Sequence, residues 1–360
     1  MRHIAITGMY RSGTTLLHHL LDGHPILKVF PVENCVLRDS MFADLLPNSK
    51  QRSLKKFFNQ IKKRGLESEA VEFIMTHEKL GLPLTKEILL SGSMGDQKVA
   101  QNFDEKVFKD KLTSYFNEIY NKEKPNTEIA LYKAYQLAYF SAIGDIAVKD
   151  DAILVNKCPE GGVMVDFLLR QTPSTKVIHI IRDPRGVVAS HKAAFGKNMY
   201  QPSAKFFRQL NLIANSLRVA EKFKGNANFL CVRYEDLVER PKETMSQIAE
   251  FIDIPMSQEL LQPTICGVSW KANSSNLDQN QPNYTIGADL QKFYKKLNQC
   301  ELDVIEEYLN LDMFKAGYSD LKKVSFFRRN FLQLKYLIRA QLSLATWIFR
   351  IKRKLLISSS

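Results

Sequence analysis

Four short apolar segments, each followed by a segment with helical periodicity, constrain the fold of this chain more than any other feature. The apolar segments are HIAIT (3–7), DAILVN (151–156), KVIHII (176–181) and NFLCVRY (228–234). In the segments that follow them, apolar residues recur at steps of three and four, as on one face of a helix. A repeated order of strand and helix is typical of a parallel sheet that helices cover on both faces. We therefore expect an α/β fold of three layers with a central parallel sheet.

Residues 36–150 do not follow this order. The segments LKKFFNQIKKRG (54–65) and EIALYKAYQLAYFSAIGDIA (128–147) have helical periodicity, and no strand stands out among them. We expect a helical insertion that walls a substrate pocket; the alternative is that these helices serve packing alone. The main domain is expected at 1–320, with the insertion inside it and a separate tail at 321–360.

Most of the net charge of +13 lies in the tail, because residues 320–360 contain ten Lys or Arg and one acid, Asp320. The rest of the chain is only mildly basic, so we expect no nucleic-acid partner. Apolar residues of the tail recur at helical steps between the basic ones, a pattern typical of an amphipathic helix on an anionic membrane surface. Packing of this helix on the body of the protein, or on a second subunit in a homodimer, remains an open alternative.

The cysteines and the apolar segments bear on the compartment. Five cysteines lie far apart and form no CxxC pair, so we expect neither a zinc site nor a disulfide framework. The chain starts almost directly with a strand, which leaves no room for a signal peptide. No apolar run reaches the roughly 18 to 20 residues that span a bilayer. We therefore expect a cytoplasmic protein, attached at most peripherally to the inner face of the membrane.

The turn GMYRSGTT, between the first strand and the first helix, has the features of an anion-binding loop. Gly8 and Gly13 allow a compact turn with inward-facing backbone N–H groups, and the helix that follows adds the positive end of its dipole. Thr14 and Thr15 offer hydroxyl groups. In the loop GxxxxGK[ST] a lysine stands where Thr14 stands here. A basic residue, Arg11, lies in the middle of the turn instead, which disfavours ATP chemistry.

A second anion-binding element is predicted in the segment KVIHIIRDPRGVVASH. Arg182 ends a strand, Asp183 can cap the next helix, and Pro184 suits the first helical position. Ser190 lies about two turns into that helix, and Gly186 lies on the same face four residues earlier. A ligand can therefore approach Ser190 without meeting a side chain at Gly186. Arg182 and Ser190 could share one phosphate.

Together, RSGTT and the pair of Arg182 and Ser190 resemble the sulfotransferases that use 3′-phosphoadenosine 5′-phosphosulfate (PAPS). The segments VNKCPEGG, VRYEDLVERP and WKANSSN resemble further elements of that family in the same order. The arginine form of the first loop is closest to the tyrosylprotein and carbohydrate sulfotransferases. The resemblance implies a P-loop-like fold, PAPS as the donor, adenosine 3′,5′-bisphosphate (PAP) as the product, and no metal ion.

The resemblance also implies roles for individual residues. Arg11 and Lys157, which we expect at the end of the second predicted strand, are the expected cations around the leaving oxygen. Glu33 is the expected base, although it lies one residue further from the loop arginine than in the tyrosylprotein-type enzymes. The alternatives are a solvated lysine at a strand end for Lys157 and an acidic loop residue paired with Arg38 for Glu33. The residues expected to bind the donor are Arg11, Ser12, Gly13, Thr14, Thr15, Arg182, Ser190, Tyr234, Lys271, Asn273, Ser274 and Ser275.

The sequence thus predicts an enzyme that moves a sulfonate group from PAPS to a hydroxyl of a carbohydrate, a glycolipid or a similar acceptor, with a carboxylate as base. An atypical P-loop kinase is one alternative, against which the missing lysine and the pair of Arg182 and Ser190 weigh. A nucleotide- or membrane-binding module without activity is another. Glu33 and Lys157 weigh against that alternative, since a binding module needs no base.

Overall fold

The computed structural model divides the chain into two compact units, which are described separately. The first comprises Met1–Ile181 and Phe223–Ala288, and the second comprises Arg182–Lys222 and Asp289–Ser360. The residues that the structure describes are 2–34, 89, 102–123, 127–145, 152–159, 161–172, 174–195, 204–270 and 295–319.

The first unit is built on a sheet in which the described residues form five parallel strands. They are β1 (Arg2–Gly8), β2 (Leu27–Glu33), β3 (Ile153–Pro159), β4 (Thr175–Ile181) and β5 (Phe229–Arg233). Their spatial order is β2-β3-β1-β4-β5, and every neighbouring pair is parallel. β1 is therefore the central strand, and the chain leaves it first toward one edge and later toward the other. In sheets of this kind, ligands bind at the carboxyl ends of the strands near such a reversal.

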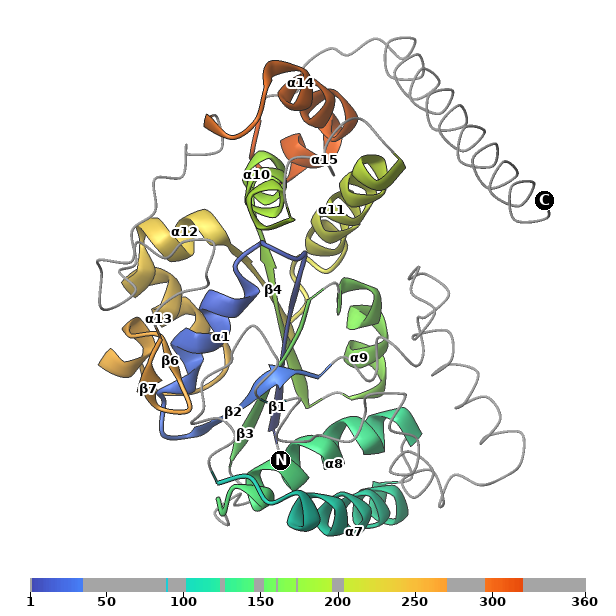
Figure 1. Cartoon of the computed structure of the whole chain (residues 1–360), viewed down its shortest axis with the longest axis vertical. Helices are drawn as coiled ribbons and strands as arrows, with labels where there is room; N and C mark the ends of the chain where they lie inside the picture. Colours follow the sequence, from blue (N-terminus) through green and yellow to red (C-terminus); the bar gives the residue numbers. More distant parts are fainter. Residues whose placement is uncertain are drawn as a thin grey trace, which may run out of the picture. The chain divides into compact units, whose positions relative to one another are not determined.

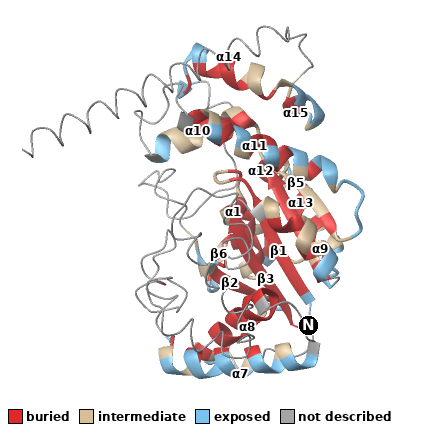
Figure 2. Ribbon diagram, turned by 90° about the vertical axis from the view of Figure 1, so that its right-hand side faces the viewer, coloured by how far each residue is buried: buried red, intermediate tan, exposed pale blue. Residues whose placement is uncertain are grey.

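Helices cover both faces of this sheet, as the repeated order of strand and helix predicts. Figure 1 shows α1 (Thr14–Asp22), α12 (Tyr234–Glu239) and α13 (Pro241–Phe251) on one side, and α9 (Val165–Gln171), preceded by the 3-10 helix η4 (Gly161–Met164), on the other. All residues of β3 are buried, as are all but the first of β1, and Figure 2 shows these strands in red. Burial on both faces explains their nearly continuous apolar sequences. The three-layer α/β prediction is confirmed.

The described part of the insertion is helical, as expected. It consists of α7 (Glu105–Glu123) and α8 (Thr127–Ala142), which pack against each other. Their aromatic residues form a buried cluster that also contains Phe30 of β2 and Leu154 of β3. The insertion is thus attached to the β2 edge of the sheet. The segment 54–65 lies outside the described residues.

Two strand boundaries differ from the sequence-based expectation. β2 is not among the strands that the sequence predicts; Glu33 is its last residue, and Pro31 interrupts its sequence pattern. β2 tolerates this proline because it lies at the edge of the described sheet. Lys157 was expected at the end of a strand, yet β3 continues to Pro159 and Lys157 is fully buried. The alternative of a solvated lysine is therefore wrong.

A short hairpin follows α13 and packs on α1. It consists of the 3-10 helix η6 (Gln258–Leu261), β6 (Thr264–Ile265) and β7 (Val268–Ser269), whose two strands are antiparallel. The carboxylate of Asp22 on α1 accepts hydrogen bonds from Thr264 Oγ1 at 2.8 Å and from the backbone N–H of Gly267 at 2.9 Å. The chain then enters the segment WKANSSN, of which only Trp270 is described.

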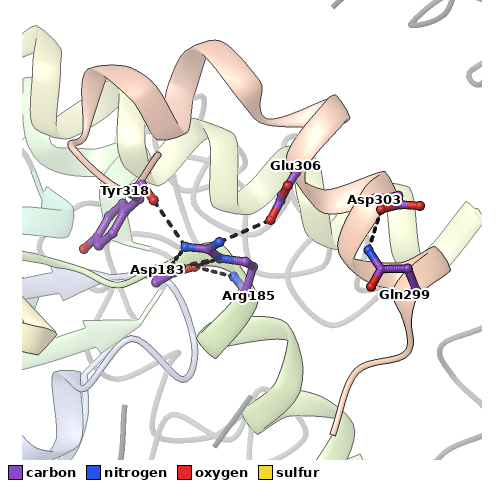
Figure 3. A network of polar contacts seen from close by, with 6 residues as sticks. All are labelled: Asp183, Arg185, Gln299, Asp303, Glu306 and Tyr318. Atoms are coloured by element: carbon purple, nitrogen blue, oxygen red, sulfur yellow. Dashed lines mark hydrogen bonds and ion pairs between the residues drawn. The ribbon is translucent and has the colours of Figure 1, made fainter. Parts of the chain in front are cut away.

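The second unit contains the helices α10 (Pro184–Phe195), α11 (Ala204–Lys222), α14 (Gln299–Tyr308) and α15 (Asn310–Lys315). α10 begins as predicted, because a carboxylate oxygen of Asp183 accepts the backbone N–H of Arg185 at 2.9 Å and Pro184 is the first helical residue. Figure 3 shows the Arg185 guanidinium between Asp183, Glu306 and the carbonyl of Tyr318, at 2.6, 3.2 and 3.2 Å. This arginine joins the start of α10 to α14 and to the segment that follows α15. Among the residues that the structure describes, no helix is both long enough and apolar enough to span a bilayer.

Candidate active site

The turn after β1 has a strained, tightly bonded backbone. Arg11 has φ 68° and Gly13 has φ 102°, so both lie in the left-handed region, which is costly for a residue with a side chain. The Ser12 backbone N–H and hydroxyl both donate to the carbonyl of Met9, at 3.1 and 2.6 Å. These bonds hold the turn closed, and α1 begins directly after it at Thr14. A turn of this shape at a helix N-terminus suits a phosphate group.

Both glycines of the turn are required by close contacts. A Cβ atom at Gly8 would lie 2.5 Å from the backbone oxygen of Ile180 on β4, and one at Gly13 would lie 2.4 Å from Cδ2 of Tyr234. The ring of Tyr234, which is buried, therefore packs against the turn. The contact of Tyr234 with adenine remains a prediction.

Lys157 lies next to this turn and connects it to Glu33. Its Nζ donates to Thr15 Oγ1 on α1 at 3.1 Å and lies 3.4 Å from Glu33 Oε1. The side chain of Lys157 is 0% exposed, whereas that of Glu33 is 36% exposed. A buried ammonium group needs partners of this kind, because removal from water penalises an isolated charge. The pair therefore presents a buried cation and a carboxylate that reaches solvent.

The register of the sheet produces this pair. Lys157 of β3 is opposite Ile6 of β1 on one side and opposite Glu33 of β2 on the other. Parallel strands bring their carboxyl ends to the same edge of the sheet, which is also where the turn after Gly8 begins. Residues from three strands and one helix thus meet at this edge.

Two buried histidines lie behind Lys157. Burial, together with the charge of Lys157, lowers the pKa of His18 well below its usual value and that of His19 to about 3. Both are therefore neutral near pH 7, and each bonds a backbone carbonyl: His18 Nε2 donates to Phe30 at 2.9 Å and His19 Nδ1 donates to Thr264 at 2.7 Å. They act as structural hydrogen-bond donors on α1, and the role of Glu33 as base remains a prediction.

Of the predicted phosphate-binding pair, Arg182 lies two residues before the start of α10 and Ser190 lies within this helix. A Cβ atom at Gly186 would be 3.0 Å from Nε of Arg182, so the guanidinium group occupies the space that this glycine leaves open. Ser190 lies four residues later and therefore on the same face. Arg182 and Ser190 are both half-buried. The binding of one anion by both Arg182 and Ser190 remains a prediction.

Lys271, Asn273, Ser274, Ser275 and the tail 321–360 lie outside the described residues. Within the described ranges, no three His, Cys, Asp or Glu residues are grouped so as to hold a metal ion.

A model of the sulfotransferase family matches residues 3–258 of this sequence. The chain belongs to the sulfotransferase family. This match includes the turn after β1, Glu33, Lys157, Arg182 and Ser190. The family uses PAPS, so the predicted class of enzyme is confirmed at the level of the family.

Individual members of the family are only distantly similar to the chain. Sequences described as candidate protein-tyrosine sulfotransferases of Caenorhabditis elegans and Caenorhabditis briggsae are 32% and 29% identical over 113 and 112 residues, in each case 30% of this chain. The matches cover 42% and 39% of those proteins, so the chain spans about two fifths of the length of the curated relatives it matches.

The chain is also similar to solved structures. The sulfotransferase domain of the Synechococcus PCC 7002 olefin synthase is 20% identical with a TM-score of 0.43, over 85% of this chain and 93% of that domain. A retinol dehydratase in complex with androsterone and the inactive cofactor PAP is 14% identical with a TM-score of 0.39, over 89% of this chain and 83% of that one.

Proposed function

We propose that the protein transfers the sulfonate group of PAPS to an acceptor hydroxyl in a single in-line step. The observation that carries this proposal is the fully buried Lys157, which lies between Thr15 at the phosphate-binding turn and the exposed carboxylate of Glu33. Sulfonyl transfer requires a cation near the leaving oxygen and a base that the acceptor can reach. Lys157, a cation shielded from water, and Glu33, a carboxylate that reaches solvent, suit these two roles. A binding module needs neither.

In the proposed step, the acceptor oxygen bonds to sulfur while its proton passes to the carboxylate of Glu33. The bond between sulfur and the bridging oxygen breaks, and its electron pair remains on that oxygen of the product PAP. Arg11 and Lys157 stabilise the charge that develops there. Cations held in a site from which water is excluded stabilise such charge more strongly than they do in water.

We assign each of the two anion-binding elements to a different group of the donor. The turn with Ser12, Gly13, Thr14 and Thr15 binds the 5′-phosphosulfate through its N–H and hydroxyl groups. Arg182 and Ser190 bind the 3′-phosphate. This assignment is supported by the guanidinium group of Arg182, which lies beside Gly186 on the face of α10 that carries Ser190. We further propose that Tyr234 contacts adenine and that the remaining contacts come from Lys271, Asn273, Ser274 and Ser275. No metal ion is needed, since arginine, lysine and backbone dipoles meet the charge of the donor.

We propose a hydroxyl of a carbohydrate, a glycolipid or a similar molecule as the acceptor. The described insertion helices α7 and α8 pack at the β2 edge, the edge at which Glu33 lies, which supports a role for the insertion on the acceptor side. The tail 321–360 is proposed to bind an anionic membrane at its inner face, with the body of the protein and a second subunit as the alternatives. Vesicle sedimentation with and without these residues tests the membrane contact, which unchanged binding after deletion excludes.

Calorimetry in the presence of a chelator tests the donor. We expect PAP to bind and ATP to bind at least about tenfold more weakly, whereas tight ATP binding restored by magnesium would indicate an atypical kinase. Arg182→Ala should weaken PAP binding by about 10- to 100-fold, equivalent to the roughly 1.5 to 3 kcal/mol of a charged hydrogen bond. Binding of adenosine 5′-monophosphate serves as the control and should not change. Equal losses for both nucleotides would contradict the role of Arg182 at the 3′-phosphate.

Transfer of ³⁵S from labelled PAPS to a panel of tyramine, N-acetylglucosamine and octyl glucoside tests the reaction. Glu33→Gln keeps the size of the side chain and its ability to bond Lys157, but it cannot accept the proton. We expect kcat to fall by roughly 10²- to 10⁴-fold, the contribution of a positioned base. Transfer at the full rate would exclude Glu33 as the base and leave the family assignment unchanged.

A further inference from the structure

The pairing of β2 with β3 is interrupted directly before Glu33. Val29 is opposite Val155 and Glu33 is opposite Lys157, so the three residues 30–32 of β2 face a single residue of β3, Asn156. Pro31 lies in this bulge and has no N–H to donate to the ladder. Bulges redirect a side chain but leave the strand locally unpaired. The regular ladder therefore cannot by itself fix the position of Glu33.

Asn156, which lies opposite the bulge, forms side-chain hydrogen bonds where the backbone pairing of β2 and β3 is interrupted. Its Nδ2 donates to the backbone carbonyl of Asn34 at 3.2 Å and to the hydroxyl of Tyr132 at 2.8 Å. Nδ2 of Asn34 in turn donates to the backbone carbonyl of Tyr132 at 3.3 Å. All three residues are at most 2% exposed, so water does not compete for these bonds. The residue after Glu33 is thus held both by β3 and by α8.

This network lies on the opposite face of the sheet from the reacting groups. Neighbouring residues of a strand point to opposite faces, so Asn156 and Lys157 point in opposite directions. Asn156 does not contact Glu33 or Lys157 in any hydrogen bond described above. It acts on the chain segment that carries Glu33, whereas Lys157 acts on the carboxylate.

We propose that Asn156 is a positioning residue for the base, and that through Tyr132 it couples the insertion helix α8 to the distance between Glu33 and Lys157. This inference rests on the proposed role of Glu33. It adds a function for the insertion: α8 supports the catalytic carboxylate from behind the sheet. A shift of the strand end by about 1 Å is enough to lower the rate by about 10²-fold.

Two variants and two matched controls test the inference. Asn156→Ala removes both bonds, and Tyr132→Phe removes only the hydroxyl while the ring remains. Thr172→Val removes a buried side-chain bond of similar kind, from Thr172 Oγ1 to the carbonyl of Leu168 at the end of α9. Tyr135→Phe removes a buried hydroxyl from the same helix as Tyr132. The four variants are compared in the ³⁵S transfer assay with the panel acceptor that reacts fastest, and by PAP calorimetry.

We expect Asn156→Ala to lower kcat by about 10- to 100-fold and Tyr132→Phe by about 3- to 10-fold, with PAP affinity unchanged within twofold. Both controls should stay within twofold of the parent protein. Hydrogen exchange of the peptide 27–34 should rise in both test variants, while that of β1 and β4 should not. An equal rise throughout the sheet, or no change in kcat, would overturn the proposal.

A double-mutant cycle separates this inference from the proposed function. If Asn156 acts through the base, Asn156→Ala should lower kcat by less than about twofold in a Glu33→Gln background, because the side chain that Asn156 positions can no longer take a proton. A loss of the same size in both backgrounds would refute the positioning role while the role of Glu33 stands. Full activity of Glu33→Gln alone would instead refute the proposed base, whatever Asn156→Ala does.

Discussion

Gly13→Ala is the substitution whose effect follows most directly from the structure. The φ of 102° places this position in the left-handed region, where a side chain costs about 1 to 2 kcal/mol. The new Cβ would lie 2.4 Å from Tyr234 Cδ2, and overpacking of this kind costs about 1 to 3 kcal/mol. We therefore expect the free energy of unfolding to fall by about 2 to 5 kcal/mol. Gly225→Ala is the matched control, since its φ is 82° but no atom lies within 4 Å of the added Cβ.

Chemical denaturation followed by far-UV circular dichroism measures both variants, and PAP calorimetry measures the donor site. The control should lose only the backbone cost, about 1 to 2 kcal/mol, and should bind PAP normally. Gly13→Ala should lose more stability than the control and bind PAP at least about tenfold more weakly, because the turn must move away from Tyr234. In combination with Tyr234→Ala, the two losses should be less than additive. Equal destabilisation by Gly13→Ala and Gly225→Ala, with normal PAP binding, would refute the packing of Tyr234 against the turn.

Three further predictions concern buried ionisable side chains. Lys157→Met should lower kcat by about 10²- to 10³-fold. The protein should still fold, because the carboxylate of Glu33 reaches solvent and can be hydrated without its partner. A smaller loss of kcat in the transfer assay would contradict the role of Lys157 at the leaving oxygen. Burial and then the charge of Lys133 lower the pKa of His3 to about 3, so the unfolded state binds an extra proton at His3 below pH 6.5, and the contribution of His3 to stability falls by about 1.4 kcal/mol per pH unit from there toward pH 3. His3→Leu should flatten the dependence of the urea midpoint on pH in that range, and an unchanged slope would show that His3 does not contribute. Arg185→Ala should lower the free energy of unfolding by about 3 to 5 kcal/mol, because two carboxylates lose a largely buried partner. Arg170 is exposed, so Arg170→Ala should lower it by less than about 1 kcal/mol. Similar unfolding midpoints of the two variants would contradict this difference.

The parts of the fold that the sequence predicts are those in which a local pattern decides the structure. β4 and α10 follow from a continuous apolar run and from Asp183 and Pro184 at a helix start. The end of β3 was missed because Lys157, which directly follows the predicted strand 151–156, is charged, and charged residues are typical of a loop. Its burial depends on strands and helices that lie far away in the sequence. The extent of β3 is thus set by tertiary contacts rather than by local preference.

The candidate site divides in the same way. The turn with Arg11 is readable because its residue types and spacing carry the chemistry within a few positions. The contact between Glu33 and Lys157 depends on the register across a bulge, and more than a hundred residues separate the two strands. Pro31 argues against a strand within its apolar segment, unless that segment is known to lie at the edge of the sheet, where proline is tolerated. The support by Asn156 has no signal in the sequence beyond an asparagine within an apolar run.

The central place of β1 has a consequence for the synthesis of the protein. Both neighbours of β1 come late, since β3 begins at Ile153 and β4 ends at Ile181. At roughly 5 to 20 residues per second, a ribosome needs about 9 to 35 seconds after β1 to deliver both of these partners. During that time the apolar β1 has no sheet to join, and closing so long a loop is slow. A nascent chain of this kind should depend on chaperones at low translation speed, and slowing translation within the insertion should lower the yield of folded protein.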